Sequence, residues 1–138
     1  MTTVYMDGVF DLFHIGHLES IQQCCLLGSK VIIGVVGDHD AKNYKRAPII
    51  PQNYRASIIQ HIKGVEQVIC PCPLKLTEKF IRDNQIDLVV HGFSNPEDET
   101  KQHEFFKVPK QLGIFRTIKY SSKANTTEII KKINESST

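Results

Sequence analysis

The strongest constraint on the fold is an alternation of short apolar runs with segments of helical periodicity. Two runs, at residues 30–37 and 86–92, are almost continuously apolar, as expected for strands covered on both faces. The five runs that predict strands occupy residues 2–7, 30–37, 66–70, 86–92 and 114–120. Strands that alternate with helices favour an α/β fold, here a Rossmann-like open parallel five-stranded sheet with helices on both faces.

Helix boundaries are marked by residues that favour helix ends. The predicted helices occupy residues 17–28, 52–64, 77–85, 99–112 and 125–133. Gly28 and Gly64 are typical C-terminal residues, and Thr77 and Asn125 are typical N-caps. Pro109 should bend or end the fourth helix early. The basic segment at 41–48 is interpreted as a loop.

Length and charge narrow the class of protein. A chain of 138 residues suits one domain, residues 1–138, and its 41% hydrophobic and 23% charged content is that of a soluble globular protein. A net charge of +2 is too small to imply nucleic acid or a membrane surface. No apolar run approaches the roughly 20 residues that span a bilayer. With cysteines interpreted as free thiols and no signal peptide, we expect a cytoplasmic protein.

Two histidines lie where the first strand passes into the first helix. In an open parallel sheet, ligands bind beyond the carboxyl ends of the strands. The first turn of a helix also attracts phosphate through its free N–H groups and partial positive charge. His14 and His17 are three residues apart and should share one face of that turn, while Gly16 lets a ligand approach the backbone. We interpret the pair as a phosphate site whose imidazoles can donate hydrogen bonds or carry charge.

Two other interpretations of the pair remain open. A zinc site would need a third ligand, and no cysteine or further histidine has convincing spacing. The histidines could also be surface residues with no role, since an H-x-x-H pattern is weak by itself.

The segment at 7–17 resembles the signature of the HIGH-motif nucleotidyltransferases and, among them, the cytidylyltransferases. The residues that match this signature are Val9, Phe10, Asp11, His14, Gly16 and His17. The resemblance extends over nearly the whole chain. It is strongest to the eukaryotic enzymes that activate phosphoethanolamine and phosphocholine, and a bacterial relative acting on glycerol 3-phosphate is similar over the same span.

The resemblance also assigns expected roles to residues beyond the histidine motif. It implies that His14, His17, Lys42 and Lys45 are catalytic, the lysines holding the outer phosphates together with Arg55. The further residues implied to contact the nucleotide are Val9, Phe10, Asp11, Gly16, Asp38, His91, Gly92, Thr126 and Thr127. Lys63 and Ser94 are tentative contacts to the phosphate acceptor. Asp11 is the possible ligand of a magnesium ion.

The sequence departs from the family pattern near its C-terminus and after the fourth strand. The family motif there is Arg, Thr, any residue, Gly, a hydrophobic residue, Ser, Thr, Thr. Thr126 and Thr127 match its end, but Tyr120 replaces the arginine and Lys123 the glycine. Phe93 stands where the family has an acidic residue. Leu74 replaces an aromatic residue, which disfavours phosphocholine because cation–π contacts would be lost.

The implied reaction transfers CMP from CTP to a small phosphorylated alcohol of the phosphoethanolamine or phosphocholine type, and pyrophosphate leaves. The implied partners are CTP, the phospho-alcohol, Mg²⁺ and a second copy of the chain, with no nucleic acid and no membrane segment. Three alternatives stay open: a catalytically weakened CTP-binding regulator, a glycerol-3-phosphate cytidylyltransferase, and an adenylyltransferase.

Overall fold

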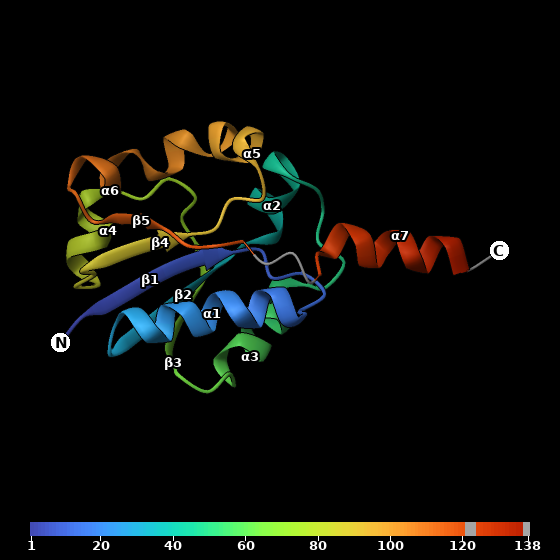
Figure 1. Cartoon of the computed structure of the whole chain (residues 1–138), viewed down its shortest axis with the longest axis horizontal. Coiled ribbons are helices and arrows are strands. Elements are labelled where there is room, and N and C mark those ends of the chain that lie inside the picture. The colour runs from blue at the N-terminus through green and yellow to red at the C-terminus, as the bar shows by residue number, and fades with distance from the viewer. Residues whose placement is uncertain (121–123, 137–138) are drawn as a thin grey trace.

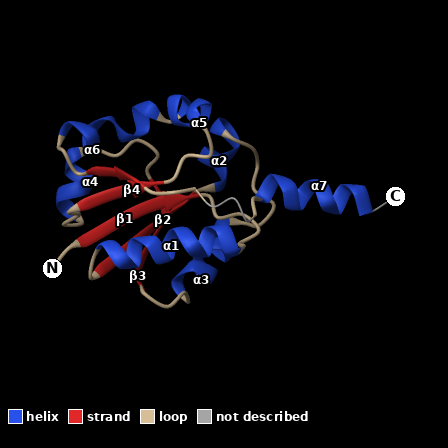
Figure 2. Ribbon diagram, in the orientation of Figure 1, coloured by secondary structure: helices blue, strands red, loops and turns tan. Residues whose placement is uncertain are grey.

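The computed structural model describes residues 1–120 and 124–136, and its centre is a five-stranded parallel sheet. The strand order is β3-β2-β1-β4-β5, and every neighbouring pair is parallel (Figures 1 and 2). The strands are β1 Thr3–Gly8, β2 Lys30–Val36, β3 Val65–Cys72, β4 Leu88–His91 and β5 Phe115–Thr117. The predicted fold class and the five predicted strands are therefore confirmed.

Helices cover both faces of this sheet. Helices α1 and α3 lie against one face, and α4, α5 and α6 against the other (Figure 1). The helices are α1 Ile15–Leu27, α2 Asp38–Tyr44, α3 Gln52–Gln60, α4 Glu78–Asp83, α5 Pro96–Lys101, η1 His103–Phe106, α6 Lys107–Gln111 and α7 Thr126–Ser136. The four cysteines are free thiols, as predicted.

Each face of the sheet has its own apolar core, because successive side chains of a strand point to opposite faces. In β1, Val4 and Met6 pack under α1 and α3. Tyr5, which lies between them, packs on the other side with Ile81 of α4 and Phe106. The central strands are thus buried on both faces, which explains their nearly continuous apolar sequences.

Two helical segments differ from the sequence prediction. Residues 38–44, all of which the sequence analysis left outside the helices, form α2, which packs through the buried Ala41 and through Tyr44. The predicted helix at 99–112 is divided into α5, the short 3₁₀ helix η1 and α6. Pro109 is the third residue of α6, a position whose N–H group has no partner within the helix, so proline is tolerated there.

The order of the strands fixes where a ligand can bind. The chain moves outward in one direction from β1 to β2 and β3, and in the other to β4 and β5, so the order reverses between β1 and β4. Helix α7 extends away from the body beyond the carboxyl ends of the strands and contains no buried residue (Figure 1). Among the residues that the structure describes, no helix is both long and apolar enough to cross a bilayer.

Candidate functional site

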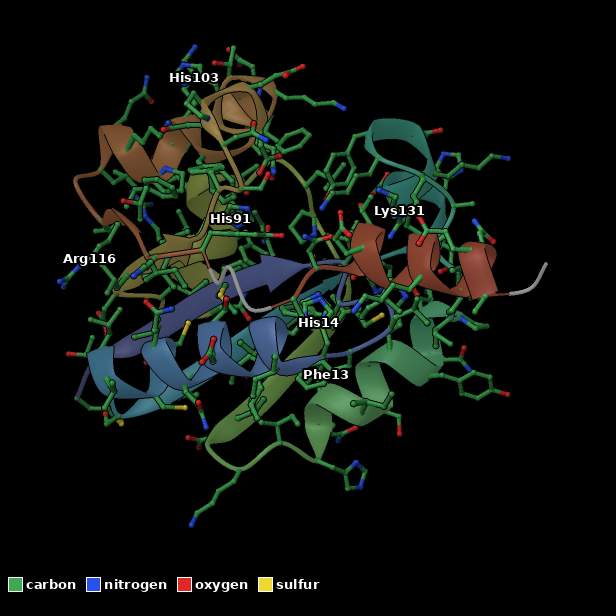
Figure 3. All side chains as sticks on the ribbon, turned by 45° about the vertical axis from the view of Figure 1, so that its right-hand side comes forward. Phe13, His14, His91, His103, Arg116 and Lys131 are labelled. Atoms are coloured by element: carbon green, nitrogen blue, oxygen red, sulfur yellow. The ribbon has the colours of Figure 1, made fainter. Side chains whose placement is uncertain are left out.

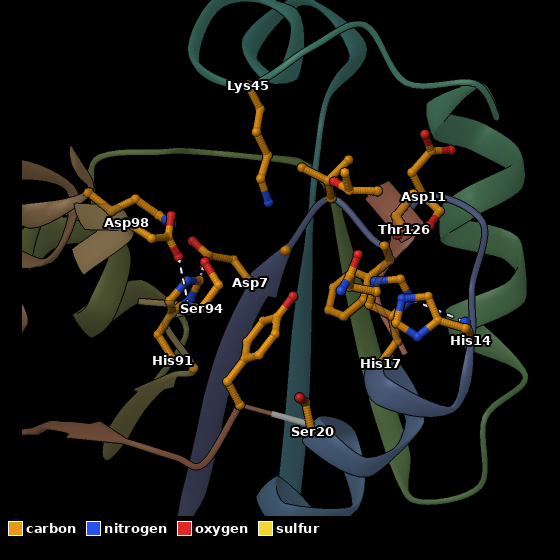
Figure 4. A pocket seen from close by; sticks show the side chains of 18 of the residues that line it. Asp7, Asp11, His14, His17, Ser20, Lys45, His91, Ser94, Asp98 and Thr126 are labelled. Atoms are coloured by element: carbon orange, nitrogen blue, oxygen red, sulfur yellow. Dashed lines mark hydrogen bonds and ion pairs between the residues drawn. The ribbon is translucent and has the colours of Figure 1, made fainter. Parts of the chain in front are cut away.

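A cavity of about 700 Å³ opens at the carboxyl ends of β1 and β4, where the strand order reverses. His14 and His91 both lie at this edge of the sheet, one at the start of α1 and the other at the end of β4 (Figure 3). Figure 4 shows two sides of the cavity. The histidine side is the segment from Phe10 to His17, whose cavity-lining residues are Phe10, Asp11, His14 and His17 and not Gly16. The acidic side consists of Asp7, His91, Asp98 and Gln102.

The two histidines of the histidine side cap helix α1. Nδ1 of His14 accepts a hydrogen bond from the Gly16 N–H group (3.0 Å), and Nδ1 of His17 accepts one from the His14 N–H group (3.2 Å). The arrangement is a capping box in which imidazoles replace the usual hydroxyl and carboxylate. It stacks the two rings with centroids 3.9 Å apart. In the neutral rings the proton must then be on Nε2, which leaves each histidine one N–H donor.

Burial keeps both imidazoles uncharged. It lowers the pKa of His14, and together with the neighbouring His14 and Lys45 it lowers the pKa of His17 to about 3. Protonation would also convert each Nδ1 from acceptor to donor and break the cap. Nε2 of His14 is buried and has no hydrogen-bond partner among the residues that the structure describes. The histidines are therefore hydrogen-bond donors, and the charged form considered from the sequence is disfavoured.

The loop that leads to the histidines has an unusual backbone. Phe10 and Leu12 have φ values of 56° and 49°, in the left-handed region that side chains rarely adopt. The Asp11 carboxylate accepts hydrogen bonds from the N–H groups of Ile49 (2.8 Å) and Ile50 (2.9 Å) and is 3% exposed. Each of its oxygens thus accepts one backbone hydrogen bond that holds this loop, and the expectation that Asp11 binds magnesium stays a prediction.

Arg55 supports the same loop through hydrogen bonds to backbone carbonyl groups. Its guanidinium donates to the carbonyl groups of Val9 (2.7 Å), Val36 (2.8 Å) and Ile50 (2.8 Å) and pairs with Asp38 at 2.6 Å. The side chain is 1% exposed and does not line the cavity. Neither Arg55 nor Asp38 lines the cavity, so the predicted nucleotide contacts of both stay predictions, and Arg55 acts here as a positioning residue.

The predicted lysines separate into different environments. Lys45 follows α2 and reaches into the cavity, as Figure 4 shows, and burial lowers its pKa despite the opposing charge of Asp98. Arg46, which the sequence analysis did not single out, also lines the cavity. Lys42 is exposed on α2 and outside the cavity, because the helix replaces the expected loop.

Lys63 lies at the wrong edge of the sheet for the predicted acceptor contact. It precedes β3, so it sits beyond the amino ends of the strands, whereas the cavity lies beyond their carboxyl ends. Ser94 does line the cavity, and so do His91 and Gly92.

Of the acidic side, the sequence analysis named only His91 and did not identify Asp7, Asp98 or Gln102. The register pairs Met6 of β1 with Val90 of β4, so the residues that follow, Asp7 and His91, come side by side. Oδ1 of Asp7 lies 3.3 Å from Nδ1 of His91. Asp98 lies beside them in Figure 4, at the start of α5. A sequence signal existed, since Asp7 and His91 each end an apolar run whose strands are neighbours.

The start of α7 closes the cavity over the histidine side. The Thr126 hydroxyl donates to the Asp11 carbonyl (2.9 Å), and the Asn125 side chain accepts from the Glu128 N–H group (2.8 Å), which confirms the predicted N-cap. Thr126, Thr127 and Tyr120 line the cavity. A side chain at Gly16 would come within 2.9 Å of the Ala124 carbonyl oxygen, so this close approach requires glycine.

Two residues that depart from the family pattern are Lys123 and Phe93. Lys123 lies outside the described residues. Phe93 does not line the cavity and packs instead against His91 and Phe106, with ring centroids 4.8 and 5.9 Å away. Asp98, five residues later, brings a carboxylate into the cavity.

A metal bound only by protein side chains does not fit this cavity. Within residues 1–120 and 124–136, no three His, Cys, Asp or Glu side chains come together as metal ligands. Nδ1 of each histidine is already an acceptor, and Asp11 is held by backbone N–H groups. The zinc alternative therefore has no support among the described residues.

Comparison with known proteins identifies the family to which the chain belongs. Residues 5–132 match the family model described as cytidylyltransferase-like. Ethanolamine-phosphate cytidylyltransferase of Dictyostelium discoideum is 34% identical over 136 residues, covering 94% of this chain and 37% of that protein. Choline-phosphate cytidylyltransferase A of Rattus norvegicus is 32% identical over 132 residues, covering 94% of this chain and 36% of that protein. The chain spans about a third of the length of these curated relatives.

A solved structure supports the fold. It is described as a lipopolysaccharide core biosynthesis protein from Thermoplasma volcanium, is 26% identical, and aligns with a TM-score of 0.70 over 90% of this chain and 99% of that one. The family match spans nearly all of the residues that build the cavity, including both histidines. This chain belongs to the cytidylyltransferase-like family.

Proposed function

We propose that this chain transfers CMP from CTP to a small phosphorylated alcohol of the phosphoethanolamine or phosphocholine type. The observation that carries the proposal is the buried Nε2 of His14, which has no partner and belongs to a ring fixed by the helix cap. A phosphate oxygen is the acceptor that such a donor needs. The names of the curated relatives support the same chemistry.

In the proposed reaction a phosphate oxygen of the acceptor attacks the α-phosphorus of CTP. A new P–O bond forms, the bond from the α-phosphorus to the bridging oxygen breaks, and pyrophosphate leaves with that electron pair. The nucleophile is already an anion near neutral pH, so the site must mainly position it and stabilise charge. His14 and His17 donate Nε2–H groups to the α-phosphate, and Lys45 supplies a mobile positive charge to the outer phosphates.

Two further expectations remain proposals. Because Asp11 is engaged with the backbone and no protein metal site fits, a Mg²⁺ requirement would have to be met by ligands of the triphosphate itself. Homodimer formation is supported by Ile15, in the first turn of α1, and Ile58 of α3, which are 46% and 45% exposed. Pyrophosphate release with and without EDTA tests the Mg²⁺ requirement. Light scattering after size-exclusion chromatography tests homodimer formation.

The decisive experiment is a pyrophosphate-release screen. The purified chain is incubated with CTP and phosphoethanolamine, phosphocholine or glycerol 3-phosphate, and each reaction is repeated with ATP in place of CTP. Release that depends on both CTP and an amino-alcohol phosphate supports the proposal. Release only with glycerol 3-phosphate, or only with ATP, would reassign the acceptor or the nucleotide.

One observation favours the alternative of a CTP-binding regulator. The described part of the cavity wall has four acidic residues against two basic ones, Lys45 and Arg46, and it has Tyr120 where the family motif has an arginine. The four acids are Asp7, Asp11, Asp98 and Glu128. Calorimetry with CTP, run beside the release assay, separates the two functions. Binding of CTP without release, across all three acceptors, would establish the regulator.

A further inference from the structure

A short segment with two adjacent cations forms part of the cavity wall. We call residues 45–48 the basic strap, because Lys45 and Arg46 both line the cavity from it. On one side of the strap, Tyr44 packs edge-on against a phenylalanine of η1, with ring centroids 5.6 Å apart. On the other side, the next two backbone N–H groups bond to the Asp11 carboxylate at 2.8 and 2.9 Å. The strap is therefore held at both ends.

Arg46 differs from the other three arginines of the chain. Arg55 and Arg82 each pair with a carboxylate. Arg116 is exposed on β5 and lies outside the cavity. Arg46 lines the cavity, and its guanidinium makes no hydrogen bond and no ion pair with any carboxylate in residues 1–120 and 124–136. It is thus a free guanidinium in the wall of a ligand-sized cavity.

The two cations of the basic strap act against each other. Burial is the main cause that lowers the pKa of Lys45; Asp98 opposes it, and the charges of Arg46 and Lys101 add to the lowering. Like charges this close are unfavourable until an anion neutralises them. A planar guanidinium also presents its N–H groups as a fork that matches two phosphate oxygens. The free side chain of Arg46 therefore fits a phosphate group of a ligand in the cavity.

Position 120, where the family motif has an arginine, offers no such charge. Tyr120 lines the cavity, and the chain before it is fixed, because the Ile118 N–H group donates to the His91 carbonyl (3.0 Å) and the Gln23 side chain donates to the Lys119 carbonyl (3.0 Å). Burial and a nearby carboxylate raise the pKa of this phenol, so it stays neutral. In the described part of the cavity wall, the lysine and arginine side chains all come from the basic strap.

We propose that Arg46 binds the outer phosphates of the nucleotide and supplies from the basic strap the guanidinium that position 120 lacks. This inference rests on the proposed function and deepens it, since it assigns a residue to the pyrophosphate group that leaves. The Asp11 carboxylate fixes the strap to the segment that carries His14 and His17. With the imidazoles on the α-phosphate, the strap is held at a set distance from them, as the outer phosphates of one nucleotide require.

Calorimetry with CTP and with CMP tests the contact, because only CTP carries the outer phosphates. Arg46→Gln should weaken CTP binding roughly ten- to a hundredfold, the loss of one charge-assisted hydrogen bond, and leave CMP binding unchanged. Arg46→Lys keeps the charge without the fork, so its loss should be smaller. Arg116→Gln is the matched control and should bind CTP as the wild type does. The melting temperature should not change, because Arg46 is exposed and unpaired among the described residues.

A double-mutant cycle tests the replacement of position 120. Tyr120→Arg is introduced into the wild type and into Arg46→Gln, and CTP affinity is measured in all four chains. If one guanidinium does the work of the other, the two substitutions are coupled. Tyr120→Arg should therefore restore most of the affinity lost in Arg46→Gln, and add much less to the wild type.

The outcomes distinguish this inference from the proposed function. Equal CTP affinity in Arg46→Gln and the wild type, or an equal loss for CMP, would overturn the phosphate contact. The same gain from Tyr120→Arg in both backgrounds would overturn the replacement. Both results leave the proposed transfer standing, because pyrophosphate release tests it separately. Arg46-dependent binding of CTP without release, across all three acceptors, would overturn the transfer and keep Arg46 as a nucleotide contact.

Discussion

The two sides of the cavity are built in different ways. The histidine side comes from one continuous stretch, Phe10 to His17, and both of its histidines bond to the backbone of that same stretch. The acidic side comes from β1, the end of β4, α5 and the residue that follows it. Its members meet only because β1 and β4 are paired in the correct register.

This difference explains what each side contributes. The histidine side combines its local hydrogen bonds with support from Arg55, Thr126 and the backbone at 49–50, and under the proposed function it presents donors in a fixed geometry to the nucleotide phosphates. The acidic side depends on the pairing of β1 with β4 and on the path of the chain after β4. We therefore expect changes on the histidine side to affect turnover and stability.

The largest effect is expected at Arg55, the support of the histidine side. Arg55→Met leaves the carbonyl groups of Val9 and Val36 without donors, so the free energy of unfolding should fall by roughly 3–5 kcal/mol. Urea unfolding measures the change. Lys63→Met, which removes a cation at the opposite edge, should change stability by less than about 0.5 kcal/mol. A loss of under about 1 kcal/mol for Arg55→Met would show that the histidine loop needs no such support.

At His14 the cap and the chemistry can be separated. Asparagine is a good N-cap, so His14→Asn should keep the helix start, whereas His14→Ala should lose about 1 kcal/mol of stability. Both variants should lower kcat by about 10²–10³-fold, because the Nε2 donor is gone. Stopped-flow rates and thermal melts provide the two measurements. Wild-type turnover in His14→Asn would mean that the imidazole only caps the helix.

The free energy of unfolding should depend on pH through His17, which lies on the histidine side. The pKa of His17 is about 3 in the folded chain and near 6.5 when unfolded, so below pH 6.5 the unfolded chain binds more protons. Stability should therefore fall as the pH drops from 7 to 5, by up to about 2 kcal/mol. His17→Gln keeps an acceptor for the cap and should flatten this slope. An unchanged slope in that variant would assign the effect to other groups.

The smallest effect is expected where α7 contacts the histidine loop. Thr126→Val removes the hydrogen bond to the Asp11 carbonyl, and the free energy of unfolding should fall by about 1 kcal/mol, with several-fold weaker CTP binding. Calorimetry with CTP measures the second effect. Thr100→Val is the control, since its hydroxyl bonds a carbonyl within α5 and outside the cavity. Equal CTP affinity in both variants would show that α7 does not shape the nucleotide side.

Patterns within short segments were sufficient to predict the sheet and the histidine side. The continuously apolar runs at 30–37 and 86–92 reflect burial on both faces, which is visible in any one strand. The capping residue Asn125 is likewise recognised from its own neighbourhood. The positions of His14 and His17 followed from the same local logic, since the end of one strand and the start of one helix define them.

The positions of the other site residues depend on contacts between distant segments and could not be predicted from local patterns. Arg55 resembles any other helical arginine until β1 and β2 bring two carbonyl groups to it. Lys42 was grouped with Lys45 because the segment was interpreted as a loop, and the helix α2 turned it away from the cavity. Asp98 was not identified as a site residue, because nothing in the sequence shows how far the chain after β4 folds back.

The contact between Thr126 and Asp11 also bears on timing during translation. The two residues are 115 positions apart, so the ribosome must add that many residues after the histidine loop has begun to form before its partner exists. At common elongation rates this interval is roughly ten seconds. A nascent chain would spend it with an open, unfinished pocket, unable to hold a nucleotide firmly. Under the proposed function, firm nucleotide binding would therefore have to wait until residue 126 has been synthesised.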